Sequence, residues 1–314
     1  MNKDLKQQVA EAAIEYCNTN NLSQEDIAGM AGINLAYING MFTGKHTHKA
    51  GKNKVLDIKD KYYISLAKTI GFALEKQYWN TVETSQYIDI RAALASAKVT
   101  GRTAMIIGDT GTGKTYTIDE FCQNYPTGTI RLTMSSLYTL NDVLNELCDK
   151  LKVPAKGSKL SKLQKIAGAL KKMQLNKEKP IVILDEAENM GVSLLKMIKG
   201  LYDAIKGVCA IVLVGTSELT DKLDRMKEKG KPGMPQFCRR FKAGTIELKD
   251  IKQEALKSFL KELGINDADL ISLLVELADN FGELNDYLEP ALIEADKKGV
   301  ELDVELFRLI YNLK

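Results

Sequence analysis

The chain has 314 residues, 45% of them hydrophobic and 27% charged, which is typical of a globular protein large enough for about two domains. It has no apolar run long enough to cross a bilayer and no apolar region at the start, so we expect a cytoplasmic protein without a membrane partner. The five scattered cysteines and two neighbouring histidines argue against a disulfide framework or a zinc site.

The formal net charge of +3 conceals an uneven distribution along the chain. Residues 1–80 carry a net +2, residues 81–248 a net +8 and residues 249–314 a net −7. This asymmetry predicts a polyanionic partner for the central part only.

The first part of the chain has the apolar spacing of short helices. We expect helices over residues 3–16, Gln24–Met30, where Ser23 is a suitable N-cap, and Asn34–Phe42. Ala28 and Gly32 stand where two helices would cross and turn, so the segment resembles a helix-turn-helix of the phage-repressor kind.

In that arrangement the second helix of the pair would face a DNA major groove. The residues it would present are Asn34, Leu35, Tyr37 and Asn39. An ordinary helical hairpin remains the alternative, and the face carries no arginine.

A polar stretch with four lysines, Thr43–Lys54, follows this pair of helices. Lys45 and its neighbours would either contact DNA phosphates or form a solvated loop. Helical spacing resumes over Val55–Gln77 and would close an all-helical domain over residues 1–78. A linker near Trp79–Ser85 and a helix over Tyr87–Lys98 come next.

A phosphate-binding loop follows the first strand of an alternating strand–helix region. The loop fits the pattern G-x-x-x-x-G-K-T, with glycines that let the backbone N–H groups point inward and a helix that starts at about Lys114. Lys114 would bind the β- and γ-phosphates of ATP, and the Thr115 hydroxyl would bind Mg²⁺. The predicted nucleotide-binding residues are Gly108, Asp109, Thr110, Gly111, Thr112, Gly113, Lys114, Thr115 and Tyr116.

The strands of this region are short, apolar and separated by helices. We expect strands at Thr103–Ile107, Thr129–Met134, Ile181–Leu184, Ile211–Val214 and Thr245–Leu248. This order predicts a parallel sheet.

Between the second and third strands lies a basic amphipathic segment, Lys150–Lys179, with ten lysines and one acidic residue. Solvated faces usually mix charges of both signs, so this bias favours a polyphosphate partner, bound without reading of bases. The predicted phosphate contacts are Lys156, Lys159, Lys162 and Lys165.

The third strand ends in two adjacent carboxylates. Asp185 is suited to the Mg²⁺ shell, and Glu186 is suited to orient and deprotonate an attacking water.

Together with the phosphate loop, this strand resembles the AAA+ ATPase superfamily. The resemblance implies a parallel-sheet P-loop ATPase core over residues 79–248 and a small helical lid over 249–314. It also implies a sensor residue at the end of the next strand, Thr216, and an arginine finger that acts on a neighbouring subunit. Arg240 is the first candidate for the finger and Arg239 the second. Where the family's lid usually has an arginine this chain has Asn285, so slow hydrolysis is expected.

The domain order and length resemble the target-delivery ATPases of transposons, of the phage Mu transposition protein B (MuB) type. This implies an ATP-dependent filament on double-stranded DNA of largely any sequence, which delivers that DNA to a transposase in the host cytoplasm or nucleoid. Slow hydrolysis, stimulated by DNA or a partner, would drive release. A helicase loader and an ATP-gated helix-turn-helix regulator of transcription are the alternatives.

Overall fold

A computed structural model describes residues 1, 3–49, 55–72, 74 and 78–313. The chain divides into two compact units, Met1–Gln77 with Gln123–Pro126, and Tyr78–Cys122 with Thr127–Lys314. In the described ranges, no helix has the length and apolar character needed to cross a membrane.

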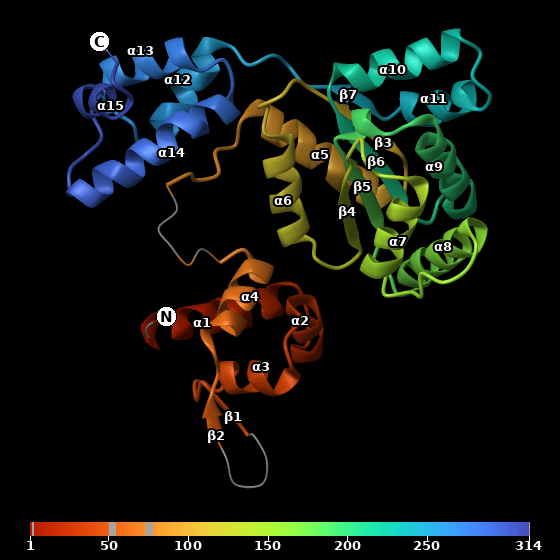
Figure 1. Cartoon of the computed structure of the whole chain (residues 1–314), viewed down its shortest axis with the longest axis horizontal. Helices are drawn as coiled ribbons and strands as arrows, with labels where there is room; N and C mark the ends of the chain where they lie inside the picture. The colour runs from red at the N-terminus through yellow and green to blue at the C-terminus, as the bar shows by residue number, and fades with distance from the viewer. Residues whose placement is uncertain (2, 50–54, 73, 75–77, 314) are drawn as a thin grey trace. The chain divides into compact units, whose positions relative to one another are not determined.

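Most of the first unit is helical. Its helices are α1 (Lys3–Thr19), α2 (Gln24–Ala31), α3 (Leu35–Phe42) and α4 (Asp60–Ile70). A hairpin of two antiparallel strands, β1 (Thr47–Lys49) and β2 (Val55–Asp57), joins α3 to α4 and projects from the helices (Figure 1).

The prediction of an all-helical first domain is therefore wrong at residues 47–49 and 55–57. Val55, Leu56 and Asp57 are exposed, so the apolar side chains at this point do not begin the face of a helix. Residues 50–54, part of the lysine-rich stretch, lie outside the described residues.

Helices α2 and α3 meet at a sharp turn. The Ser23 hydroxyl and the Asp26 carboxylate form a capping box at the start of α2, which satisfies backbone N–H groups of its first turn. Gly32 ends α2 with a φ of 65°, a left-handed conformation that glycine adopts without steric cost. Ile27 and Ile38 are fully buried and hold the two helices in a shared core.

The second unit contains a five-stranded parallel sheet with the order β4-β5-β6-β3-β7. Its strands are β3 (Ala104–Ile107), β4 (Thr129–Thr133), β5 (Ile181–Asp185), β6 (Ala210–Gly215) and β7 (Thr245–Glu247). The predicted parallel sheet is confirmed, with strand ends within two residues of those expected.

Helices cover both faces of this sheet because the strands are apolar on both sides. Ile106 packs on the face covered by α5 (Ser85–Thr100) and α6 (Lys114–Asn124), whereas Met105 and Ile107 pack on the opposite face. That opposite face is covered by α7 (Leu140–Lys150), α8 (Lys159–Leu175), α9 (Val192–Ile205), α10 (Ser217–Glu228) and α11 (Met234–Lys242), as Figure 1 shows.

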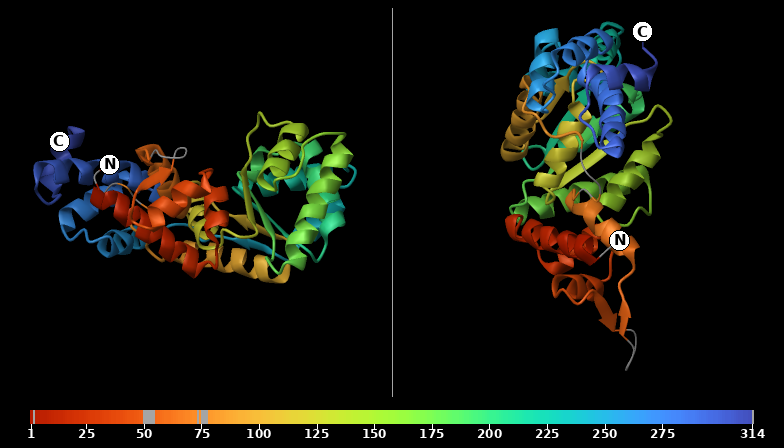
Figure 2. Two further views of the ribbon diagram at one scale, coloured as in Figure 1. Left: turned by 90° about the horizontal axis from the view of Figure 1, so that it is seen from below. Right: turned by 90° about the vertical axis from the view of Figure 1, so that its left-hand side faces the viewer.

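The last four helices form a bundle with a core of its own. They are α12 (Gln253–Glu262), α13 (Ala268–Leu277), α14 (Phe281–Lys298) and α15 (Val304–Tyr311), drawn in blue in both views of Figure 2. Trp79 and Val82, which precede α5, pack against this core. The segment before the sheet is thus joined to the bundle that follows it.

Candidate functional site

The phosphate-binding loop lies at the carboxyl end of β3. Gly111 and Gly113 have φ angles of 77° and 82°, so both adopt the left-handed conformation that the loop motif needs. Helix α6 begins at Lys114, which directs its N-terminus at the loop. The Lys114 ammonium donates to the carbonyl oxygens of Gly108 and Asp109, each at 2.6 Å.

Parallel pairing brings the ends of β5 and β6 to the same edge as the loop. Ile107 of β3 pairs with Gly215 of β6, which precedes Thr216. β5, which ends at Asp185, pairs with the other side of β6. Asp185 and Thr216 therefore both line the pocket that contains the loop.

Asp185 accepts hydrogen bonds from groups on two other elements. The Thr115 hydroxyl lies 3.1 Å from its Oδ2 atom, and Nη2 of Arg131 lies 2.9 Å from the same atom. Arg131 also forms an ion pair with Asp119 of α6. Hydroxyl and carboxylate oxygens at this spacing fit Mg²⁺, which prefers oxygen ligands in nucleotide sites.

Two predicted catalytic groups differ in their surroundings. Thr216 has a buried hydroxyl oxygen with no hydrogen-bond partner among the described residues. Glu186 is exposed, and its Oε2 atom accepts from the Asn189 amide at 3.3 Å. The φ of Glu186 is 53°, so the chain turns sharply just after β5.

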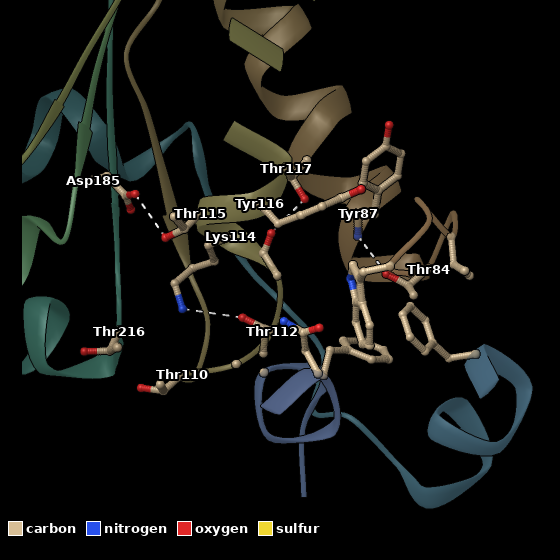
Figure 3. A pocket seen from close by; sticks show the side chains of 18 of the residues that line it. Thr84, Tyr87, Thr110, Thr112, Lys114, Thr115, Tyr116, Thr117, Asp185 and Thr216 are labelled. Carbon is tan, nitrogen blue, oxygen red and sulfur yellow. Dashed lines mark hydrogen bonds between the residues drawn. The ribbon is translucent and has the colours of Figure 1, made fainter. Parts of the chain in front are cut away.

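The pocket around these groups has a volume of about 350 Å³ and an aromatic end (Figure 3). The Phe259 ring lies 5.0 Å from Trp79 and 4.8 Å from Phe281, measured between ring centroids. Tyr87 and Tyr116 also line the pocket. This end can pack against a nucleobase, and the polar end can hold phosphates.

Sequence reasoning missed most of this aromatic end because its residues come from separate segments. Trp79 lies in a segment that we interpreted as a linker, and Phe259 and Phe281 lie in the C-terminal helices. The tryptophan was a usable signal, since it is the only one in the chain.

The start of α14 lies directly against the phosphate-binding loop. A Cβ atom added to Gly111 would lie 1.9 Å from Oδ1 of Asn280, the residue that caps α14. Asn285 of the same helix lines the pocket, and its Oδ1 atom is buried without a partner in the described part of the chain. Asn285 stands where the family's lid usually has an arginine, so this position places an amide rather than a guanidinium in the pocket.

Lys114 is a partly buried cation among carboxylates. Burial lowers the pKa of Lys114, and the negative charges of Glu188, Asp185 and Asp109 oppose this effect. A bound polyphosphate would add negative charge beside this ammonium and would favour its protonated form.

The two candidate finger arginines have different environments on α11. Arg240 forms an ion pair with Asp203, and its guanidinium lies 4.9 Å from the centroid of the Tyr202 ring. The hydroxyl of Thr103, which lies just before β3, donates to the backbone carbonyl oxygen of Arg240 at 2.5 Å. Arg239 is exposed. Arg240, the first choice from the sequence, is thus held within its own subunit.

The four lysines predicted to contact DNA from the basic segment do not share one environment. Lys156 and Lys159 are exposed. Lys165 is half-buried, and its ammonium donates to the Lys156 carbonyl at 2.7 Å. Lys162 is only 6% exposed, and its ammonium donates to the side-chain oxygens of Asn141 and Asn145 at 2.8 and 2.6 Å.

The prediction that Lys162 contacts DNA phosphates is therefore wrong, because its side chain is buried. It lies one helical turn before Ile166, on the side of α8 that packs against the core, and α7 supplies acceptors for its ammonium. Leu160 of the same helix is 64% exposed.

In the first unit, the candidate DNA-contacting residues lie on α3 or next to its ends. The Asn34 side chain accepts from the Ala36 N–H and so caps α3. The Tyr37 ring lies 4.5 Å from both His48 of the hairpin and Tyr62 of α4, measured between centroids. Asn39 and Lys45 are exposed.

Comparison with known proteins agrees with this geometry. Residues 98–223 match a family model described as an AAA domain. A search among curated protein sequences found no match to this chain.

Two solved structures have a similar fold. The ORC2 protein of Aeropyrum pernix, in ADPNP–ADP complexes, has a TM-score of 0.54 at 16% identity, over 73% of this chain and 67% of that one. The ORC1 protein of Aeropyrum pernix, in complex with DNA, has a TM-score of 0.51 at 15% identity, over 70% of this chain and 62% of that one. This chain thus spans less than two thirds of the ORC1 chain. At such identities the likeness concerns the fold.

The sheet order, the loop and the match together define an AAA domain with the fold of an AAA+ P-loop ATPase. The phosphate loop, Asp185 and Thr216 lie at the carboxyl ends of neighbouring strands, where parallel sheets bind ligands. This site supports ATPase activity in general.

Proposed function

We propose that this protein is an ATP-dependent DNA-binding protein that assembles into an oligomer on double-stranded DNA and hydrolyses ATP slowly with Mg²⁺. In the finer form of the proposal, the assembly delivers target DNA to a transposase. The observation that carries the proposal is the charge of the nucleotide pocket.

Among the described residues that line this pocket, Lys114 is the only cation, whereas Asp185, Glu186 and Glu188 are carboxylates. A triphosphate needs more positive charge than one ammonium supplies, above all in the transition state of phosphoryl transfer. Mg²⁺ held by Thr115 and Asp185 would neutralise part of the phosphate charge. The remainder would come from a second copy of the chain.

Arg239 is our candidate for the group supplied by that copy. It is exposed on α11, whereas Arg240 is held by Asp203 and Tyr202. An arginine that reaches a neighbour's triphosphate makes hydrolysis depend on assembly. With such an arginine, the protein would hydrolyse ATP only as an oligomer.

The lysines of the basic segment support DNA as the partner of the assembly. Lys156, Lys159, Lys171 and Lys172 are exposed, and Glu178 is the only acidic residue in the whole segment. Lysines that contact phosphates bind DNA of any sequence, with an affinity that falls as salt rises.

The first unit supports a second DNA contact. Its α2–turn–α3 arrangement fits a helix-turn-helix, and Asn39 is exposed on α3. Lys45 and Lys49 are exposed at the hairpin that follows α3 and could contact phosphates beside the groove. With Asn34 used as a cap and Tyr37 packed between rings, this surface can make few base contacts.

The transposition role rests on domain order, which resembles that of the MuB-type ATPases. A helicase loader is the second candidate, because its AAA+ core has a similar form. The two roles differ in partner, so binding to a purified replicative helicase or to a transposase encoded by the same element separates them.

Electron microscopy of the protein with ATP and random duplex DNA tests the proposal. We expect continuous coating of the DNA with ATP and bare DNA with ADP. Binding to a single palindromic site by ATP-independent dimers would instead identify a regulator of transcription.

A further inference from the structure

Besides Asp185 and Glu186, a third carboxylate, that of Glu188, lines the nucleotide pocket. The chain leaves β5 at Asp185 and turns sharply at Glu186, where φ is 53°. A single 3₁₀ turn, Ala187–Asn189, then returns the chain to the pocket. As a result Glu186 is exposed, whereas Glu188 is partly buried and lines the pocket.

The Glu188 carboxylate is packed against the end of β6. A Cβ atom added to Gly215 would lie 2.4 Å from Oε2 of Glu188, so any larger residue at this position would displace the carboxylate. The backbone of Glu188 is also fixed, since Lys222 of α10 donates to its carbonyl oxygen at 2.7 Å. The backbone of Glu188 is thus held by α10, and its carboxylate lies against the end of β6.

Two polar atoms at this point are buried and have no hydrogen-bond partner among the described residues. They are Oε2 of Glu188 and Oγ1 of Thr216, the residue after Gly215. An unpaired buried polar atom is destabilising, so a folded protein usually retains one only where a ligand or water completes its hydrogen bonding. The carboxylate oxygen can accept a hydrogen bond from a water molecule, and the hydroxyl can donate one to the same water.

Glu188 also lies close to the phosphate-binding lysine. Its charge has the largest Coulombic effect on Lys114, ahead of those of Asp185 and Asp109. A group that contacts Gly215 and lies close to Lys114 faces the end of the loop that would hold the γ-phosphate.

We propose that Glu188 and Thr216 together hold the water that attacks the γ-phosphate, an inference that rests on the proposed ATPase activity. Glu188 accepts a hydrogen bond from one O–H of this water, and Thr216 bonds to its oxygen. The water oxygen forms a bond to the γ-phosphorus while the bond from that phosphorus to the β–γ bridging oxygen breaks, and ADP leaves with the electron pair. The water proton that is lost passes to a pocket carboxylate, for which Glu186 remains the proposed base, and then to solvent.

The test compares Glu188→Gln with wild type in single-turnover hydrolysis of ATP on DNA. ATP binding is measured separately through the fluorescence of Trp79, the only tryptophan, which lines the pocket. We expect Glu188→Gln to hydrolyse ATP about tenfold more slowly, because an amide oxygen accepts the hydrogen bond from the water more weakly than a carboxylate does. Its dissociation constant for ATP should stay within about threefold of wild type, because its side chain keeps its shape and binds the attacking water rather than the nucleotide.

Glu218→Gln is the matched control, because Glu218 is an exposed carboxylate of α10 outside the nucleotide pocket. It should hydrolyse ATP like wild type. Thr216→Val provides a second measurement. If both side chains hold one water, the double variant should be little slower than the slower single variant.

The inference is overturned if Glu188→Gln hydrolyses ATP at the wild-type rate, or if it loses ATP binding and thermal stability together. Fully multiplicative effects of the two substitutions would also contradict a shared water. A wild-type protein that binds ATP on DNA without hydrolysing it would overturn the proposed ATPase activity itself.

Discussion

Nη2 of Arg131 lies 2.9 Å from Oδ2 of Asp185, and that carboxylate side chain is only 2% exposed. The same guanidinium pairs with Asp119 on α6, the helix that follows the phosphate loop. One arginine on β4 thus connects the carboxylate suited to Mg²⁺ with the helix that begins at Lys114.

Removal of this arginine should destabilise the protein. Arg131→Met leaves the buried Asp185 carboxylate without its cation, which we expect to lower the free energy of unfolding by about 3 kcal/mol. Urea denaturation measures the change. Arg131→Lys keeps the positive charge and should lower the free energy of unfolding by a smaller amount. An unchanged unfolding free energy in Arg131→Met would show that the pair contributes nothing.

An arginine in place of Asn285 should tighten ATP binding. Oδ1 of Asn285 is buried at the pocket without a partner among the described residues, and the pocket contains little positive charge. A new charge-assisted hydrogen bond to a phosphate is worth about 1.5–3 kcal/mol, so we expect about tenfold tighter binding of ATP. Trp79 fluorescence measures it. Asn285→Gln, which adds no charge, is the control, and equal affinity for both variants would contradict the prediction.

Subunits that carry different defects should restore one another's hydrolysis. Arg239→Ala keeps the nucleotide pocket but lacks the proposed finger, whereas Lys114→Ala keeps the finger but cannot bind ATP. Each should be inactive alone, and their mixture on DNA should regain part of the wild-type rate. Full activity of Arg239→Ala alone would exclude it as the finger. The same mixing experiment with Arg240→Ala then tests the other arginine.

Lys98 should make stability depend on pH in the alkaline range. Its ammonium donates to the carbonyl oxygens of Thr127 and Lys179, each at 3.0 Å, and burial lowers its pKa to about 8. An unfolded lysine keeps its proton up to a pKa of 10.5, so folding releases a proton between these values. Stability contributed by this group therefore rises with pH from about 8 to about 10.5.

Comparison with Lys98→Met isolates this effect from other groups that titrate in the same range. As the pH rises from about 8 to about 10.5, the unfolding free energy of wild type should rise relative to that of Lys98→Met. A difference that stays constant with pH would show that Lys98 has the same pKa in the folded and unfolded chain.

Local motifs made much of the nucleotide site predictable. The loop from Gly108 to Thr115 and the strand ending at Asp185 each carry their geometry in adjacent residues. Parallel pairing then brings Asp185 and Thr216 to one edge without further information. The two hairpin strands at residues 47–49 and 55–57 could not be found in this way, because strands of three residues have no readable alternation.

Side-chain environments that depend on distant segments were not predictable. The burial of Glu188 requires a left-handed φ at Glu186, and no residue preference indicates this conformation for glutamate. Lys162 had the charge of a surface residue, and only the two asparagines of α7 explain its place in the interior. Asp203 and Tyr202, which hold Arg240, belong to a helix remote from it in sequence.

The central claim is that ATP in this pocket controls assembly on DNA. Binding of the protein to a labelled random duplex, followed by fluorescence anisotropy with ATP, with ADP and without nucleotide, tests it most directly. We predict tight, salt-sensitive binding only with ATP, and its loss in Lys114→Ala, which removes the phosphate-binding ammonium while the fold remains. Equal DNA affinity of wild type and Lys114→Ala in the presence of ATP would contradict the claim.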